Sequence, residues 1–316
     1  MYKFKFFKKI YIKSFLIFVL MLSLIPILKF YNLSIKDILL KFHSLNSFQV
    51  SIIFLFYILI SSFDIITRKI LIFFMTNKKT KFINLCFIHF CSMATNYSTP
   101  VKIGFPVAIF LMKKKEKINY SDGTSIILIE LLSIMFLTGL VSLFGTIYYL
   151  KKQISFVIIS FLILCLAILA TIYLSQKIQF TNQKNLKYIT SITQSLKKIN
   201  FTHLFFYILL RSILIFLNGL NLLILIHFFS GTLTFIQAIV ATNTSFFLGA
   251  ISMIPMGLGS REASMLFFLN LFSVPTNIAI SVITLQRFIS TGLTFIIGYF
   301  LISFSTLKYS LQNKDN

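Results

Sequence analysis

The stretch TSIILIELLSIMFLTGLVSLFGTIYYL, from Thr124 to Leu150, decides the fold class of this protein. Its only charged side chain is Glu130. As an α-helix rising about 1.5 Å per residue, the stretch is roughly 40 Å long, which exceeds the roughly 30 Å hydrocarbon core of a bilayer. The stretch therefore predicts a helix that spans a membrane.

The composition extends this prediction to the rest of the 316 residues. Hydrophobic residues make up 57% of the chain and charged residues 12%, and the mean hydropathy is +0.91. A soluble domain usually carries about 25% charged residues. We therefore expect a single integral membrane domain, 1–316, that is all-α and polytopic with about six full spans. Besides Thr124 to Leu150, the apolar stretches are Ile10 to Leu28, Phe48 to Ile72, Ile154 to Leu174, Phe201 to Phe229, and Pro275 to Thr306.

The polar segments exclude several functional classes. The longest, Ser175 to Asn200, is too short to bury a core of its own, so no separate soluble catalytic domain is expected. No phosphate-binding loop G-x-x-x-x-G-K-[ST] occurs, so we do not expect this chain to use ATP directly. The histidines and cysteines lack metal-ligand spacing, and no catalytic set is visible. We expect no cofactor, no metal ion and no catalytic residue.

The basic residues predict the orientation of the chain in the membrane. The net charge of +23 comes mainly from lysines that flank apolar stretches, where cytoplasmic loops favour them, and so it does not indicate nucleic acid. The lysines before Ile10 and after Thr306 place both termini in the cytoplasm. The expected location is the cytoplasmic (inner) membrane of a bacterial-type cell, with multiple passes.

Two apolar regions are each broken into pieces too short to cross comfortably. The first comprises Phe82 to Thr99 and Pro100 to Met112, and lysine clusters precede and follow it. The second comprises Thr232 to Ile254 and Arg261 to Val274. We expect two re-entrant hairpins, the first entering from the cytoplasm and the second from outside.

The two broken regions predict an internal repeat. Each contains Pro-x-x-x-Gly, as Pro100 to Gly104 and Pro255 to Gly259, and a charge follows the proline after 30 residues in one case and 32 in the other. These charges are Glu130 and Arg287. Hairpins of opposite orientation predict inverted-topology halves, about 1–150 and 151–316, with a substrate site near the midplane.

The segment 175–200 between the halves is predicted to contain a cytoplasmic interfacial helix. Its apolar residues share one side of a helix and its lysines occupy the other. Two interpretations stay open, a linker at the membrane surface and a binding site for a partner. The apolar residues are Leu186, Ile189, Ile192, Leu196 and Ile199, and the lysines are Lys184, Lys187 and Lys198.

The charges inside apolar stretches are the candidate site residues, because a charge at mid-bilayer costs about 2.5 to 3.5 kcal/mol on insertion scales. Asp64 and Arg68 are four residues apart, so we expect them to neutralise each other. The other charges are two acids against three arginines, which leaves one arginine without a counter-ion. These five are Glu130, Glu262, Arg211, Arg261 and Arg287.

Gly257 and Gly259 complete the candidate site. Glycines there allow backbone N–H groups to turn toward one point ahead of a helix, and Arg261 adds a positive fork, which together favour a phosphate or carboxylate. Alternatively, the glycines only make a tight hairpin and the arginine reaches out to water. Glu262 similarly has two interpretations, a substrate contact and a first-turn acid that braces the helix.

Two motifs resemble a known family. They are NYSTPVKIG, Asn96 to Gly104, and IPMGLGSREA, Ile254 to Ala263, followed by Arg287 and Gly298. They look like the flippase-like membrane family that includes the transmembrane region of lysylphosphatidylglycerol synthases, over nearly the whole chain. Typical members have an acid directly after the first motif glycine, where this chain has Phe105.

The resemblance implies translocation of an anionic phospholipid or a polyprenyl-phosphate-linked glycan between leaflets. The aminoacyl-transfer domain of the synthases is not found in this sequence, so the chain alone is not expected to transfer lysine. The alternative is a membrane-embedded partner of a separate glycosyl- or aminoacyl-transferase. An intramembrane enzyme acting on a polyprenyl phosphate is the third hypothesis. The expected partners are membrane lipids.

Overall fold

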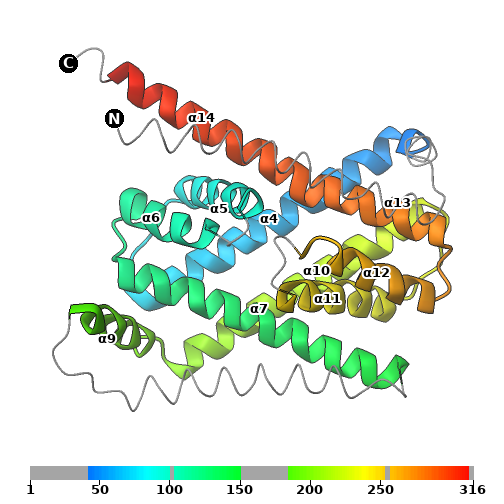
Figure 1. The fold of residues 1–316 in the computed structure, drawn as a ribbon, viewed down its shortest axis with the longest axis horizontal. Coiled ribbons are helices and arrows are strands. Elements are labelled where there is room, and N and C mark those ends of the chain that lie inside the picture. The colour runs from blue at the N-terminus through cyan, green and yellow to red at the C-terminus, as the bar shows by residue number, and fades with distance from the viewer. Residues whose placement is uncertain (1–41, 100–102, 151–183, 253–256, 313–316) are drawn as a thin grey trace.

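The computed structural model describes residues 42–99, 103–150, 184–252 and 257–312 (Figure 1). Throughout these ranges the regular structure is helical, with no strand. The predicted spans at 10–28 and 154–174 lie outside the described residues, as do Pro100 and Pro255 of the repeated motif.

Four helices in the described ranges are long and apolar enough to cross a membrane. They confirm the prediction of an all-α, multi-pass membrane protein. Their bounds are α4 (Ser47–Thr76), α7 (Tyr120–Tyr149), α10 (Phe201–Phe228), and a last continuous helix made of α13 (Thr276–Arg287), η2 (Phe288–Leu293) and α14 (Thr294–Gln312).

Local sequence signals explain several helix ends. Asn46 caps α4 by accepting from the backbone N–H of Gln49 at 2.8 Å, and Gln49 accepts in return from the N–H of Asn46 at 2.9 Å. This reciprocal pair satisfies two N–H groups that a helix start leaves free. Asn77 ends α4 in the left-handed conformation, φ 52°, which asparagine adopts more readily than most residues.

The two broken regions form pairs of short helices, as predicted. The pairs are α5 (Phe82–Tyr97) with α6 (Gly104–Glu116), and α11 (Phe235–Ile251) with α12 (Ser260–Leu271). Within each pair the helices pack together, and the pairs lie toward opposite ends of the molecule (Figure 1). A Cβ at Gly104 would overlap the carbonyl oxygen of Ser92, so glycine is what lets α6 lie against α5.

The long helices connect the two ends. α14 packs against α5, and α7 packs against α11, so each short-helix pair contacts the long helix of the other half of the chain (Figure 1). Small residues make these approaches close: a Cβ at Gly298 would overlap the carbonyl oxygen of Phe90, and a Cβ at Gly145 would lie 2.5 Å from Cγ1 of Val240. The halves are therefore interlocked.

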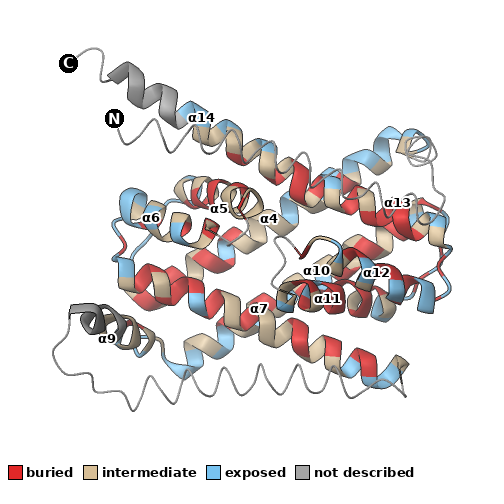
Figure 2. Cartoon of the chain, viewed as in Figure 1, coloured by how far each residue is buried: buried red, intermediate tan, exposed pale blue. Residues whose placement is uncertain are grey.

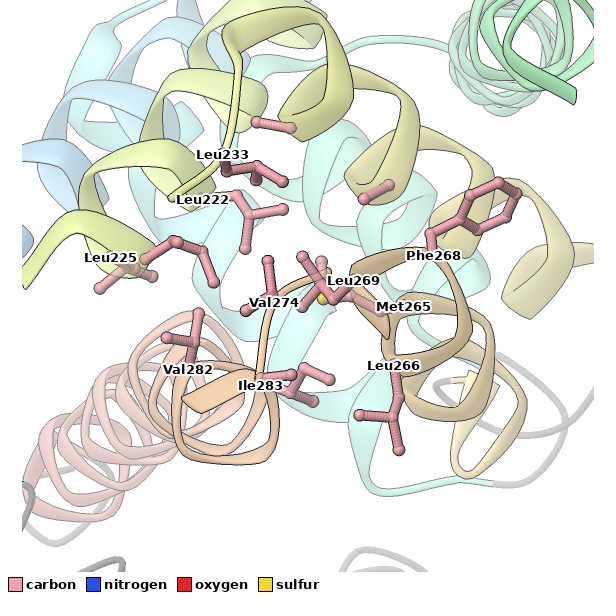
Figure 3. Close-up of a cluster of buried hydrophobic side chains, with 14 of the residues drawn as sticks. Leu222, Leu225, Leu233, Met265, Leu266, Phe268, Leu269, Val274, Val282 and Ile283 are labelled. Carbon is pink, nitrogen blue, oxygen red and sulfur yellow. The ribbon is translucent and has the colours of Figure 1, made fainter. Parts of the chain in front are cut away.

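Two apolar clusters form the core. One joins α10 to α11, α12 and α13, and Figure 3 shows Leu222, Met265 and Val282 among its side chains. The other joins α4 to α5, α6 and α7, with Tyr207 of α10 fully buried in it. Many large apolar side chains remain exposed on the outside, as expected for helices that face lipid (Figure 2).

Helix α9 (Lys184–Leu196) occupies the predicted interfacial segment. The hydroxyl of Ser125 on α7 donates to the carbonyl of Ile192 at 3.1 Å, and Lys198 pairs with Asp122 of α7 at 2.6 Å. Leu196 packs against the core cluster around α5 and α6. Protein contacts therefore cover one end of its apolar side, while its position at a membrane surface stays a prediction.

Candidate functional site

A cavity of ≈ 390 Å³ lies between the helices. Every helix described above except α9 contributes to its lining, so it lies where the two halves meet. Five of the seven predicted site residues line it, which are Glu130, Arg211, Gly257, Arg261 and Arg287. Gly259 and Glu262 do not line it. The motifs of both hairpins therefore meet at one internal space.

The expected pairing of Asp64 with Arg68 is wrong. Arg68 instead donates to both oxygens of Glu130 on α7, from Nε at 2.8 Å and from Nη2 at 3.0 Å, and both side chains are buried. The two parallel hydrogen bonds match the planar guanidinium to the planar carboxylate. Arg68 therefore forms its ion pair with a residue of another helix, not with Asp64 on its own helix.

Asp64 pairs with α10 and approaches α5. Its carboxylate accepts from Nη1 of Arg211, which also donates to the hydroxyl of Thr67 at 3.0 Å. Nδ1 of His89 lies 3.4 Å from the other oxygen of Asp64. A bond between α4 and α10 joins the first half of the chain to the second, and the sequence analysis missed this role of Asp64.

Glu262 braces the second hairpin. One carboxylate oxygen accepts from Nε of Arg287, and the other accepts from the backbone N–H of Gly259 at 2.7 Å. The expectation that the N–H of Gly259 is available to an anion is therefore wrong, because the capping carboxylate of the same helix already occupies it. The contact supports the bracing interpretation of Glu262.

Arg261 carries the surplus charge. Its guanidinium lies over the ring of Phe246, 5.3 Å from the centroid, and it lines the cavity. In the described ranges, the carboxylates of Asp64, Glu130 and Glu262 are each taken by another arginine, and no carboxylate pairs with Arg261. The predicted surplus of one positive charge among the membrane-embedded groups is thus found on a residue that faces the cavity.

Close glycine packing positions Arg261. Gly257 has φ +63°, and a Cβ there would lie 2.9 Å from Cα of Gly249 on α11. A Cβ at Gly249 would in turn lie 2.9 Å from Cβ of Arg261. The turn before α12 can therefore lie directly against α11, which brings the arginine to the cavity wall.

Neutral polar residues in the lining were missed by the sequence analysis. Asn218 and Asn221 on α10, Asn243 on α11, and Asn96 and Tyr97 on α5 all line the cavity. The signal was available for α10, because amides inside a membrane span need a polar partner as charges do. The lining of the cavity by α5, and by Phe105 at the start of α6, brings the first hairpin to the site.

The last long helix changes its winding at the site. Directly after Arg287 the chain forms the π-helix η2, and Ile289 and Ser290 of this turn line the cavity. Single π-helical turns are rare and occur frequently at functional sites. As for metal sites, the described ranges hold no group of three or more histidine, cysteine or acidic side chains arranged to bind an ion.

Comparison with known proteins gives two matches. A family model described as the lysylphosphatidylglycerol synthase TM region matches residues 11–298. A UPF0104 membrane protein of Methanocaldococcus jannaschii is 26% identical over 206 residues, which cover 63% of this chain and 88% of that protein. The first match spans both short-helix pairs and all the cavity-lining arginines.

Proposed function

Because the chain belongs to the family of the lysylphosphatidylglycerol synthase transmembrane region, we propose that it moves an anionic phospholipid or a lipid-linked glycan between the leaflets of the cytoplasmic membrane. One observation carries the proposal: Arg261, with which no carboxylate in the described ranges forms an ion pair, lines a cavity to which all four helices long and apolar enough to span a membrane contribute. A phosphate fits such a guanidinium, because two phosphate oxygens can accept two parallel N–H hydrogen bonds from it.

The size of the cavity supports binding of a headgroup rather than of a whole lipid. Its ≈ 390 Å³ lies near the lower end of the roughly 300 to 1,000 Å³ typical of ligand pockets. The acyl or prenyl chains would therefore stay outside, against the apolar surface that faces lipid. In this proposal, Arg261 and Gly257 form the phosphate end of the site, and Glu262 and Gly259 fix the helix that carries Arg261. The other charged residues of the lining are Asp64, Arg68, Glu130, Arg211 and Arg287.

The arrangement of the halves supports alternating access. We propose that residues 1–150 and 151–316 are inverted repeats that rock against each other around the headgroup site. Arg68 pairs with Glu130 inside the first half and Arg287 pairs with Glu262 inside the second, whereas Asp64 and Arg211 pair across the halves. In this mechanism the first two pairs move as units with their halves. The pair of Asp64 with Arg211, and the close contacts of α5 with α14 and of α7 with α11, lie where the halves move against each other.

The test is lipid movement by the purified protein. The protein is reconstituted in phosphatidylcholine vesicles with a trace of headgroup-labelled phosphatidylglycerol, and a membrane-impermeant quencher reports the outer-leaflet fraction. We expect redistribution without a change in lipid mass. Arg261→Ala should slow it by roughly ten- to hundredfold, because losing one charge-assisted hydrogen bond costs about 1.5 to 3 kcal/mol.

Two variants make this experiment specific. Lys79→Ala removes one positive charge from an exposed position outside the cavity and should leave the rate unchanged. Arg261→Lys keeps the charge but loses the planar fork, so its rate should be intermediate. A chemically altered lipid would indicate an enzyme instead. Inactivity that a co-purifying transferase reverses would favour the partner hypothesis.

A further inference from the structure

We infer that the cavity has a second ligand subsite, apart from Arg261, at which buried N–H and O–H donors bind oxygen atoms of the ligand. The donors are Nη1 of Arg68, Nε of Arg211 and the hydroxyl of Thr242. The inference rests on the proposed function and deepens it, because it predicts that the lipid headgroup carries oxygen acceptors in addition to the phosphate bound by Arg261.

The three donor groups are buried and have no protein partner. Arg68, Arg211 and Thr242 are 4%, 3% and 3% exposed, and all three line the cavity. None of the three donor atoms has a hydrogen-bond partner in the described ranges. Buried polar groups in folded proteins are nearly always hydrogen-bonded, because an unmade bond leaves the cost of desolvation uncompensated. Three such donors at one cavity therefore call for acceptors that enter the cavity.

The ion pairs of the two arginines leave these donors available. Arg68 binds both oxygens of Glu130 through Nε and Nη2, so Nη1 is not used. Arg211 binds Asp64 and Thr67 through Nη1, and its Nε is not used. The carboxylates hold both guanidinium groups in place, so the remaining N–H groups are oriented before a ligand arrives. Because each positive charge is balanced, the acceptor can be a neutral oxygen as well as a second phosphate.

Thr242 differs from the other threonines of the lining in how its hydroxyl is used. Thr138 and Thr294 each donate to the backbone carbonyl four residues earlier, at 2.7 and 2.6 Å. This is a common local bond for threonine inside a helix. Thr242 on α11 makes no such bond in the described part of the chain. Its hydroxyl therefore keeps both its proton and its lone pairs for a group in the cavity.

The second subsite lies on different walls of the cavity from Arg261. The ion pairs of Arg68 and Arg211 join α4 to α7 and to α10. Arg261 lies in the first turn of α12 and packs against Gly249 of α11. Thr242 precedes Gly249 by seven residues, which is about 10 Å along the helix. A ligand that contacts all these walls needs oxygen atoms besides those of its phosphate.

The experiment compares probes that share one alkyl chain and differ in their oxygens. Methyl hexadecyl phosphate is a monoanionic phosphodiester whose oxygens all belong to the phosphate. Hexadecyl phosphoglycerol has the same charge and adds neutral hydroxyls, whereas hexadecyl diphosphate adds a second phosphate. Native mass spectrometry of the purified protein in detergent measures the affinity for each probe.

The protein should bind one of the two larger probes roughly tenfold or more tightly than methyl hexadecyl phosphate, because charge-assisted hydrogen bonds are added. The tighter of the two identifies the source of the second acceptor, a neutral oxygen or a phosphate. Equal affinity for all three probes would overturn the second subsite.

A matched pair of variants tests the hydroxyl. Thr242→Val keeps the shape of the side chain, and it should weaken binding of the tighter probe by roughly two- to tenfold, the effect of losing one neutral hydrogen bond, without changing methyl hexadecyl phosphate. Thr244→Val is the control, because Thr244 is also fully buried on α11 with an unpartnered hydroxyl in the described ranges but does not line the cavity. This control should bind every probe as the unaltered protein does.

Two results with Thr242→Val would contradict the inference. Equal weakening of all three probes would assign the hydroxyl to the phosphate end of the site. Unchanged binding of all three would mean that water, and not the ligand, occupies the donors. Either result would overturn the second subsite.

Arg68→Lys tests the guanidinium donors. Lysine keeps a positive charge beside Glu130 but has no Nη1, so a folded variant should bind the tighter probe roughly tenfold or more weakly. Its unfolding temperature in detergent shows whether the ion pair persists. Wild-type affinity of the folded variant for all three probes would overturn the subsite. If the variant does not fold, Thr242→Val decides.

Binding and movement separate this inference from the proposed function. Tighter binding of a larger probe that Thr242→Val weakens, without any lipid movement in the vesicle assay, would uphold the subsite and overturn translocation. Lipid movement with equal affinity for all three probes would uphold translocation and overturn the subsite. Absence of both would overturn both.

Discussion

At the residue scale, the buried pair of Arg68 and Glu130 sets a stability prediction. Their side chains are 5% and 6% exposed and form two parallel hydrogen bonds. Arg68→Met leaves a buried carboxylate without a partner, which typically costs about 3 to 5 kcal/mol. Adding Glu130→Leu removes that carboxylate, so the double variant should recover most of the loss. Thermal unfolding in detergent, followed by size-exclusion chromatography, measures the effect.

The control for this pair is Lys113→Met, which removes an exposed lysine that donates to Asn119 at 3.2 Å. It should leave the unfolding temperature nearly unchanged, because exposed contacts contribute little. If the double variant unfolded at a temperature as low as Arg68→Met alone, the carboxylate would not be the source of the loss.

Charge arithmetic on the sequence predicted a surplus arginine but assigned the pairs wrongly. Acids and arginines in apolar stretches can be counted without a structure, so the sequence was enough to show that the arginines exceed the acids by one. The partners could not, because sequence spacing describes only contacts along one helix, as for Asp64 and Arg68. The observed partners are 62 and 147 residues away in sequence. The neutral asparagines were missed because only charged groups were counted.

At the scale of elements, the turn before α12 sets a second prediction. Gly257→Ala should slow lipid movement more than Gly259→Ala. Both glycines have positive φ, so both variants strain the backbone, by about 1 to 2 kcal/mol. Only Gly257 also contacts another helix, since a Cβ at Gly259 meets nothing within 4 Å. The vesicle assay and the unfolding temperature together measure the difference.

Gly292→Ala serves as the comparison, because its φ is unremarkable and its added Cβ would meet only a ring carbon of Phe288 at 3.7 Å. This variant should keep a near-normal unfolding temperature. If Gly257→Ala and Gly259→Ala behaved alike, the contact between the turn and α11 would not position Arg261.

Both short-helix pairs were predictable from their apolar lengths, with lysine clusters flanking the first pair, and the predicted bounds agree with the structure within a few residues. The predicted pieces Phe82 to Thr99 and Pro100 to Met112 correspond to α5 and α6. Predicting which long helix each pair contacts was not possible. These contacts depend on glycines such as Gly298, which matters because the backbone of α5 at Phe90 packs directly against it, and not because of its own backbone conformation.

At the scale of the whole molecule, the opposite orientation of the two hairpins is a topology prediction. In a variant lacking Cys86, Cys91 and Cys165, single cysteines at Lys79 and Lys115 should both react with an impermeant reagent from the cytoplasmic side, because lysine clusters surround them. Both positions are exposed, so access depends on the membrane side alone.

Ser230→Cys and Ser273→Cys provide the outside positions for the same measurement. Both serines are exposed at turns, and cysteine has nearly the same shape, so neither change should disturb the fold. Both should be labelled only from outside. Labelling of positions 79 and 115 from opposite sides would make the first pair a full span and remove the inverted repeat.

The interlocking of the halves also fixes an order of events during synthesis. The sulfur of Cys91 on α5 lies 4.0 Å from the carbonyl oxygen of Gly298 on α14, a contact between residues 207 positions apart. At about 5 to 20 residues per second, a ribosome needs roughly 10 to 40 s to cover that distance. Throughout this interval the first short-helix pair lacks α14, the helix against which it packs in the folded protein. A chaperone or insertase has that time in which to hold it.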